Sequence, residues 1–171
     1  MEIVPQLEQY QLFPKYFSAP LFLMWEMTGK CPCNCIYCYN ESPKVVKELT
    51  SEEAMNLARD IVKMKPFSVC LTGGEPTLRE DLFEIASYLK KNGIPVSTIT
   101  SGWTMNEKLA EKMCSVFDYL QVSIDGPRAE IHDVIRGVRG SFERAVNAVN
   151  LLKEKGVKRL SVAYSLTKYN K

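Results

Sequence analysis

Four of the six cysteines in this 171-residue chain fall within eight consecutive positions. Cys31, Cys35 and Cys38 are separated by three and then by two residues, and Cys33 lies inside the first gap. Three thiolates that converge suit an iron–sulfur cluster that ordinarily takes four ligands, so one iron keeps an open position. The spacing therefore predicts a cluster at which a further ligand is bound and transformed.

Two other interpretations fit the cysteines taken alone. A tetrahedral zinc site usually draws two pairs of ligands from separate segments, and the remaining cysteines, Cys70 and Cys114, stand alone. A disulfide-bonded loop is typical of secreted proteins, but the acidic start at Met1 lacks the apolar stretch of a secretory signal. Both interpretations are weaker than the iron–sulfur one.

A second group of residues lies where an apolar run over residues 67–72 stops. It consists of Gly73, Gly74, Glu75 and Pro76. Paired glycines let the backbone approach a ligand closely, and an adjacent carboxylate can accept hydrogen bonds from an ammonium group. An ordinary turn between a strand and a helix gives the same pattern.

A third group begins with Ser123 and Asp125 in an apolar stretch. Residues two apart on a strand point to the same side, so this hydroxyl and carboxylate suit a ribose diol or an amino acid carboxylate over the end of a sheet. His132, Arg136 and Arg144 follow within about twenty residues.

Together the three groups resemble the radical S-adenosylmethionine (radical SAM) enzymes, in the branch of anaerobic sulfatase-maturating enzymes and SPASM-type peptide modifiers. The resemblance spans roughly residues 23–170. It implies that Cys31, Cys35 and Cys38 bind a 4Fe–4S cluster whose fourth ligand is the amino acid end of S-adenosylmethionine. The aromatic residue before the last cysteine, Tyr37, fits the family pattern.

The resemblance also assigns roles to the other residues. Glu75, within the segment 73–76, would hold the amino group of the cofactor, and Ser123 would meet its carboxylate with either Arg136 or Arg144. Asp125 would act more indirectly, on the loop or the ribose. His132, the single histidine, is expected to be a structural hydrogen-bonding residue.

The reaction implied by the resemblance is reductive cleavage of S-adenosylmethionine to a 5'-deoxyadenosyl radical, which removes hydrogen from a peptide or protein substrate. A flavodoxin or ferredoxin would supply the electron. The rival hypothesis from another class is a non-catalytic iron–sulfur or zinc module that relays electrons or stabilises a partner, but it leaves the second and third groups unexplained. The sequence identifies neither the substrate nor the oligomeric state.

Composition agrees with a soluble enzyme. The chain has 22 basic and 20 acidic residues, so its net charge is only +2. A charge this small creates no strong electrostatic field that would attract nucleic acid or an anionic membrane. The longest apolar stretch, residues 19–25, is too short to span a bilayer. Six cysteines in a chain with no signal segment fit a reducing cytoplasm and a metal cofactor better than crosslinks.

The elements that must position these residues alternate between strands and helices. Apolar, β-branched runs predict strands over residues 21–27, 67–72, 96–100, 119–124 and 159–165. Capping boxes predict helices that begin at Thr50 with Glu53, Thr77 with Glu80, and Thr104 with Glu107. A fourth helix is predicted to start at Ser141 and to end at Gly156.

This order predicts an α/β fold with parallel strands and helices outside the sheet. Each group of site residues follows the end of a predicted strand, where ligands sit in such folds. The family fold is a partial barrel of six strand–helix units, of which about five are predicted here. We therefore expect residues 1–18 to be an N-terminal arm, and residues 19–171 to be a C-terminally truncated radical SAM core that lacks the sixth unit and any auxiliary-cluster domain.

Overall fold

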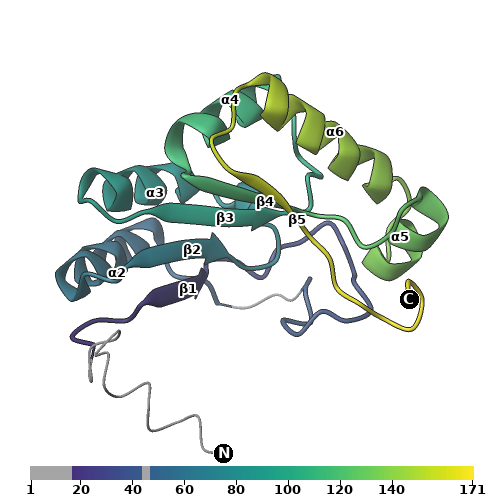
Figure 1. The fold of residues 1–171 in the computed structure, drawn as a ribbon. Helices are drawn as coiled ribbons and strands as arrows, with labels where there is room; N and C mark the ends of the chain where they lie inside the picture. The colour runs from purple at the N-terminus through teal and green to yellow at the C-terminus, as the bar shows by residue number, and fades with distance from the viewer. Residues whose placement is uncertain (1–16, 44–46) are drawn as a thin grey trace, which may run out of the picture.

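The structure, a computed structural model, describes residues 17–43 and 47–171. The predicted N-terminal arm over residues 1–18 lies almost wholly outside the described residues. One parallel sheet forms the centre, with its strands in chain order (Figure 1). The strands are β1 (Phe22–Glu26), β2 (Ser68–Thr72), β3 (Val96–Thr100), β4 (Tyr119–Ser123) and β5 (Leu160–Ala163). Each lies within a range predicted from the sequence, and the α/β fold is confirmed.

Helices follow the strands and pack mainly on one face of the sheet (Figure 1). They are α2 (Ser51–Met64), α3 (Leu82–Lys91), α4 (Glu107–Val116), α5 (Ala129–Arg136) and α6 (Ser141–Glu154), with a short 3-10 helix, η2 (Pro76–Leu78). Leu71 and Leu120 on the strands are fully buried together with Ile85, Met113 and Leu152 on the helices. This core fixes the carboxyl ends of all five strands at one edge.

The capping-box predictions were confirmed at one helix and wrong at two. Thr50 caps α2, with its hydroxyl accepting from the Glu53 amide and the Glu53 carboxylate accepting from the Thr50 amide. Thr77 instead lies in η2, because its hydroxyl donates to Glu75. Helix α4 begins after Asn106, whose side chain accepts from the Leu109 amide at 2.9 Å.

Of the last two helices, the sequence predicted α6 and missed α5. Helix α6 begins at Ser141 as predicted, and Gly156, just beyond its end, has the left-handed conformation with φ of 75°. Helix α5 was not predicted. It is only 8 residues long and has no side-chain cap at Arg128, so it lacks the local signals of a helix start. It carries both His132 and Arg136.

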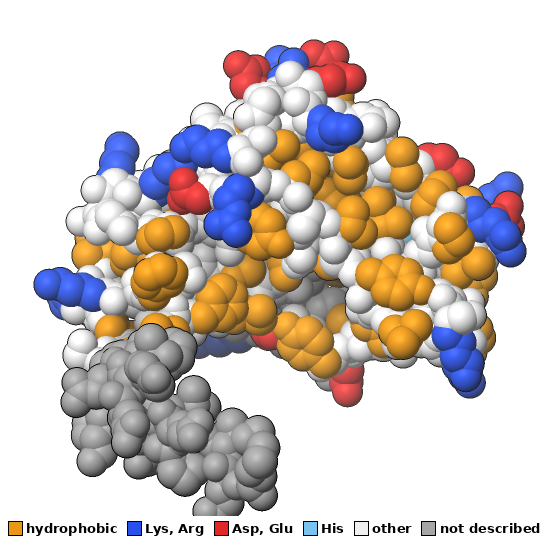
Figure 2. All heavy atoms as spheres, viewed as in Figure 1, with side chains coloured by type: hydrophobic (Ala, Val, Ile, Leu, Met, Phe, Trp, Pro, Cys, Tyr) orange, Lys and Arg blue, Asp and Glu red, His pale blue; other side chains and the backbone are white. Residues whose placement is uncertain are grey.

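The two outer strands, β1 and β5, each pair on one side only among the described residues. Figure 2 shows hydrophobic side chains gathered on the face of the molecule that is turned toward the viewer. On or beside the outer strands, four hydrophobic side chains are about half exposed, namely Phe22, Met24, Val162 and Tyr164. In the part of the chain that the structure describes, no helix is long and apolar enough to cross a membrane.

Asp133 joins α5 to the start of α6. One carboxylate oxygen accepts from the Gly140 amide at 2.6 Å, and the other accepts from the Ser141 hydroxyl at 2.8 Å and the Phe142 amide at 2.9 Å. Burial alone would raise the pKa of Asp133, but these hydrogen bonds outweigh it and hold the pKa below its usual value. The charged carboxylate therefore stabilises the fold.

We expect Asp133→Asn to lower the free energy of unfolding by about 1 kcal/mol near neutral pH, since one backbone donor loses its acceptor. Because the pKa is lowered in the folded state, the stabilisation is present above about pH 4 and is lost as the pH falls through the folded pKa. Denaturant titrations from pH 7 to pH 3 measure the difference. The control is Asp60→Asn, an exposed residue paired with Lys63, and a loss as large there would contradict the assignment.

Candidate functional site

The loop that follows β1 carries the four cysteines, and on one side it pairs with the glycine turn after β2. The Gly74 amide donates to the Thr28 carbonyl at 2.7 Å, and the Glu75 amide donates to the Lys30 carbonyl at 2.8 Å. A Cβ atom at Gly73 would collide with the Thr28 carbonyl, and one at Gly74 with the Lys30 carbonyl. Only glycine permits this contact, so the turn positions the cysteine loop.

The other side of the cysteine loop pairs with the end of α5. The Asn34 amide donates to the Arg136 carbonyl, and the Ile36 amide donates to the Ile135 carbonyl, each at 3.0 Å. Gly137, with φ of 67°, ends this helix and lies directly against the Asn34 carbonyl. The loop is thus fixed between two elements far from it in sequence.

A cavity of about 260 Å³ opens at this edge of the sheet. Members of all three groups of residues singled out in the sequence lie in its wall. They are the four loop cysteines, the two glycines of the turn after β2, and Ser123. The wall residues relevant to the site are Cys31, Cys33, Cys35, Cys38, Tyr37, Thr72, Gly73, Gly74, Thr100, Ser101, Ser123 and Arg136. The wall therefore combines soft sulfur donors with neutral oxygens and one cation.

The thiols of Cys31, Cys33 and Cys35 are close enough to perturb one another. The contact with the Cys33 sulfur is the main cause that raises the pKa of Cys31 and Cys35, and burial is the second. The same contacts lower the pKa of Cys33. The Cys33 amide also donates to the Cys31 sulfur at 3.4 Å. Because metal ligation requires thiolates, cluster binding must release protons here.

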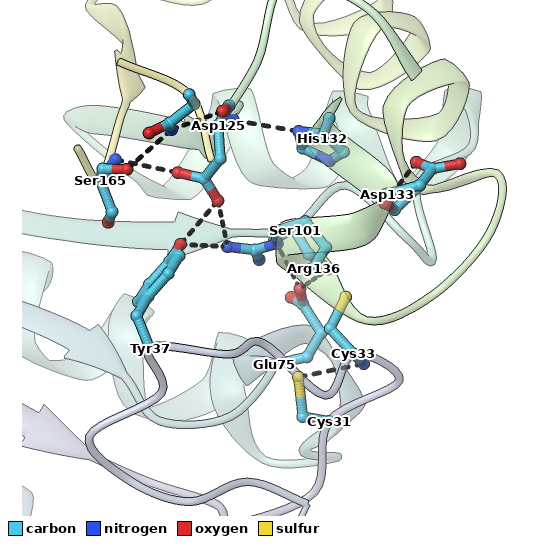
Figure 3. Close-up of polar contacts among 12 residues, drawn as sticks. Cys31, Cys33, Tyr37, Glu75, Ser101, Asp125, His132, Asp133, Arg136 and Ser165 are labelled. Atoms are coloured by element: carbon cyan, nitrogen blue, oxygen red, sulfur yellow. Dashed lines mark hydrogen bonds and ion pairs between the residues drawn. The ribbon is translucent and has the colours of Figure 1, made fainter. Parts of the chain in front are cut away.

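The buried Arg136 and Asp125 form a polar group with the half-buried Tyr37 beside the cysteines (Figure 3). The Tyr37 hydroxyl donates to Asp125 Oδ2 at 2.6 Å, and Arg136 Nη1 donates to the Tyr37 oxygen at 2.9 Å and lies 3.3 Å from the same carboxylate oxygen. Burial raises the pKa of Tyr37 to about 12, so the phenol keeps its proton. Asp125 fixes the arginine and does not line the cavity itself.

Arg136 retains an unused donor. Its Nε is buried without a hydrogen-bond partner in the part of the chain that the structure describes, while the residue lines the cavity and is 7 % exposed. Ser123 lies in the same wall. A buried guanidinium with a free N–H is suited to bind an anionic group such as a carboxylate.

Arg144, the other arginine that the sequence analysis left open, lies elsewhere. It stacks 4.3 Å from the centre of the Trp103 ring, and its Nη1 donates to the Trp103 carbonyl at 3.0 Å. It is not among the cavity residues. In this structure Arg144 supports the loop after β3, while Arg136 is the arginine at the cavity.

His132 has the structural arrangement expected from the sequence. Its Nδ1 accepts from the Asp125 amide at 3.0 Å, and its ring packs edge-on against Phe142. Burial, with the nearby Arg136 charge, lowers the pKa of His132. The neutral ring therefore holds the backbone next to Asp125.

Two residues after β5 complete the polar group and were missed by the sequence analysis. The Ser165 amide donates to Asp125 Oδ1 at 2.9 Å, and the Asn170 side chain donates to the Asp125 carbonyl at 2.7 Å. Their relation to Asp125 has no local signal, because they follow it by 40 and 45 positions. Ser165 and Asn170 reach Asp125 only because β5, which precedes them, pairs with β4.

Comparison with known proteins identifies the family. The model of the radical SAM superfamily matches residues 25–170. The chain belongs to the radical SAM superfamily. Members bind a 4Fe–4S cluster and S-adenosylmethionine, and the parallel sheet of this chain is the partial barrel of that family.

The chain is similar to enzymes with differing reactions. It is 32 % identical over 170 residues to the mycofactocin maturase MftC of Mycolicibacterium smegmatis, covering 98 % of this chain and 42 % of that protein. It is 36 % identical over 140 residues to the AdoMet-dependent heme synthase of Methanosarcina barkeri, covering 80 % and 40 %. A solved structure of anSMEcpe with bound AdoMet and the Kp18Cys peptide is 25 % identical, with a TM-score of 0.70 over 84 % of this chain and 42 % of that one. The chain thus spans about two fifths of the length of these relatives.

The residues present fit the cofactors of the family. Within residues 17–43 and 47–171, no three His, Cys, Asp or Glu side chains surround a single-ion position. A cluster needs thiolates around a larger cavity, and Cys31, Cys35 and Cys38 all line one. Arg136, whose Nε has no partner among the described residues, lines the same wall and offers a cation that fits the carboxylate of an amino acid.

The contact between Gly137 and the cysteine loop leads to a matched pair of variants. Gly137 and Gly156 both have positive φ, but only Gly137 has a neighbour that a Cβ would strike. Both alanine variants lose roughly 1 to 2 kcal/mol of stability from the left-handed backbone. We expect only Gly137→Ala to displace the loop, so that a thiol reagent labels the buried Cys33 several-fold faster in the unloaded protein, as read by mass spectrometry. Equal labelling in the two variants would contradict the proposed fixing of the loop by α5.

Proposed function

We propose that this chain is the catalytic core of a radical SAM enzyme whose cluster is held by Cys31, Cys35 and Cys38. The observation that supports this best is one cavity whose wall contains three correctly spaced thiols, Ser123 and Arg136, an arginine whose Nε has no partner among the described residues. A passive electron-relay or zinc module has no need of an unsatisfied cation beside the sulfurs. We therefore prefer the enzyme to that alternative.

In this proposal the protein binds, orients and shields the cofactors. When bound, the cluster and S-adenosylmethionine would supply one-electron reductive cleavage of the sulfonium to methionine and a 5'-deoxyadenosyl radical able to abstract hydrogen. Arg136 and Ser123 hold the carboxylate of S-adenosylmethionine, and Asp125 and Tyr37 orient Arg136. Gly73 and Gly74 allow the backbone to approach the ligand, and Pro76 starts η2 behind them.

For the substrate we propose a peptide or protein. The support is the similarity to a mycofactocin maturase over nearly the whole chain, and the likeness to anSMEcpe bound to a peptide. The similarity to a heme synthase makes a porphyrin the competing class. Incubating the complete protein with S-adenosylmethionine, a reductant and peptides or porphyrins separates the two, because cofactor cleavage should rise only with the correct class.

We further propose a cytoplasmic location and a flavodoxin or ferredoxin as electron donor. Free thiols persist in a reducing compartment, and none of the six cysteines is in a disulfide. Replacing a chemical reductant by each donor protein in the cleavage assay tests this partner.

Alanine replacement of each loop cysteine tests the ligand assignment. After anaerobic reconstitution, Cys31→Ala, Cys35→Ala and Cys38→Ala should each lose most of the bound iron. Cys33→Ala should retain it, because three protein ligands leave one iron position, which the cofactor takes. Iron analysis and the absorption spectrum measure this result. Retention of iron by Cys31→Ala together with its loss from Cys33→Ala would reverse the assignment.

The two arginines give a second test. Arg136→Lys keeps the positive charge but removes the planar N–H groups, so the affinity for S-adenosylmethionine should fall about tenfold or more, in line with one lost charge-assisted hydrogen bond. Arg144→Lys should change it less than about twofold. Anaerobic equilibrium dialysis of the cluster-loaded proteins measures both affinities. A tenfold loss of affinity confined to Arg144→Lys would show that Arg144, and not Arg136, binds the carboxylate.

A further inference from the structure

The carboxylate of Glu75 has no acceptor position left for a ligand. Its Oε1 accepts from the Thr77 hydroxyl at 2.7 Å, the Thr77 amide at 3.3 Å and the Thr100 hydroxyl at 2.8 Å. Its Oε2 accepts from the Ser101 amide at 2.7 Å and the Ser101 hydroxyl at 2.5 Å. An ionised carboxylate offers about four lone-pair sites, so these five donors occupy it fully.

Glu75 is also turned away from the cavity. It is 0 % exposed and is not among the residues that line the cavity wall, within the part of the chain that the structure describes. Figure 3 shows its carboxylate directed toward Ser101. An ion pair between Glu75 and the ammonium group of a bound amino acid would require several of these hydrogen bonds to break.

Ser101 lies between Glu75 and the cavity. It lines the cavity wall and is 7 % exposed. A serine hydroxyl has one proton and two lone pairs, and here the proton is donated to Glu75 Oε2. The hydroxyl oxygen can therefore act only as an acceptor toward any other group.

One lone pair of Ser101 Oγ is available for such a group. The Trp103 amide lies 3.4 Å from this oxygen and occupies at most one position. Thr100 has the same arrangement, since its hydroxyl donates to Glu75 and accepts from the Gly102 amide, but this amide contact is shorter at 3.0 Å and Thr100 is only 2 % exposed. Ser101 is thus the better placed of the two hydroxyls to accept from a ligand.

We propose that the Ser101 hydroxyl accepts a hydrogen bond from the ammonium group of bound S-adenosylmethionine, and that Glu75 is a positioning residue that holds this hydroxyl as an acceptor. This inference rests on the proposed function and changes the role that the sequence pattern gave to Glu75. The charge of Glu75 reaches the ligand through Ser101. The contact adds a binding residue at the end of β3 to those after β1, β2 and β4.

The test is a double-mutant cycle on the cluster-loaded protein, with S-adenosylmethionine affinity measured by anaerobic equilibrium dialysis. Ser101→Ala should weaken binding about tenfold, and Ser101→Thr, which keeps a hydroxyl, should restore most of it. Glu75→Gln should weaken binding when Ser101 is present, and by less than about twofold when position 101 is alanine. Thr77→Val removes another donor to Glu75 that does not line the cavity, and it should change the affinity by less than about twofold.

Two results would overturn the proposal. One is unchanged affinity in Ser101→Ala, which decides the matter even if Glu75→Gln does not fold. The other is a full-sized loss from Glu75→Gln in the Ser101→Ala background, which would indicate a direct contact of the carboxylate with the ammonium group. Failure of the unaltered, cluster-loaded protein to bind S-adenosylmethionine would instead overturn the proposed function, and this inference with it.

Discussion

The site depends on one constraint, which is that the cysteine loop has no regular secondary structure over residues 27–43. Its backbone donors and acceptors must therefore be paired by other elements, because buried unpaired groups are costly. The turn at Gly73 and Gly74 supplies partners on one side, and the end of α5 at Ile135 and Arg136 supplies them on the other. The sheet keeps these partners in place, so the spacing of the thiols is a property of the whole fold.

Buried charges follow the same rule of complete pairing. Asp125 and Arg136 are both nearly inaccessible and lie 3.3 Å apart, and the Tyr37 hydroxyl connects them to the cysteine loop. Glu75 is surrounded by hydroxyl and amide donors. Burying an unpaired ion costs several kcal/mol, so a buried Nε of Arg136 that has no partner among the described residues is informative. Arg136 lines the cavity, where the carboxylate of the proposed cofactor would complete the network.

The failed helix predictions show how tertiary contacts override local signals. Thr77 and Thr104 each begin a sequence that reads as a capping box, yet their hydroxyls lie 2.6 Å from each other. The contact joins the loop after β2 to the loop after β3, and Asn106 takes over as the cap of α4. Capping patterns identify a hydroxyl that needs a partner, whereas the fold decides which partner it finds. At Thr50 the hydroxyl and the amide both pair with Glu53, and the local rule held.

The sequence by itself determined the strand ranges, the parallel order and the spacing of Cys31, Cys35 and Cys38, because hydrophobic periodicity and ligand spacing are local properties. It also placed each chemical group at the end of a strand. Only the tertiary structure put Arg136 rather than Arg144 at the cavity, and turned Glu75 toward Ser101. Those choices depend on contacts between segments 25 or more positions apart, for which a single sequence carries no periodic signal.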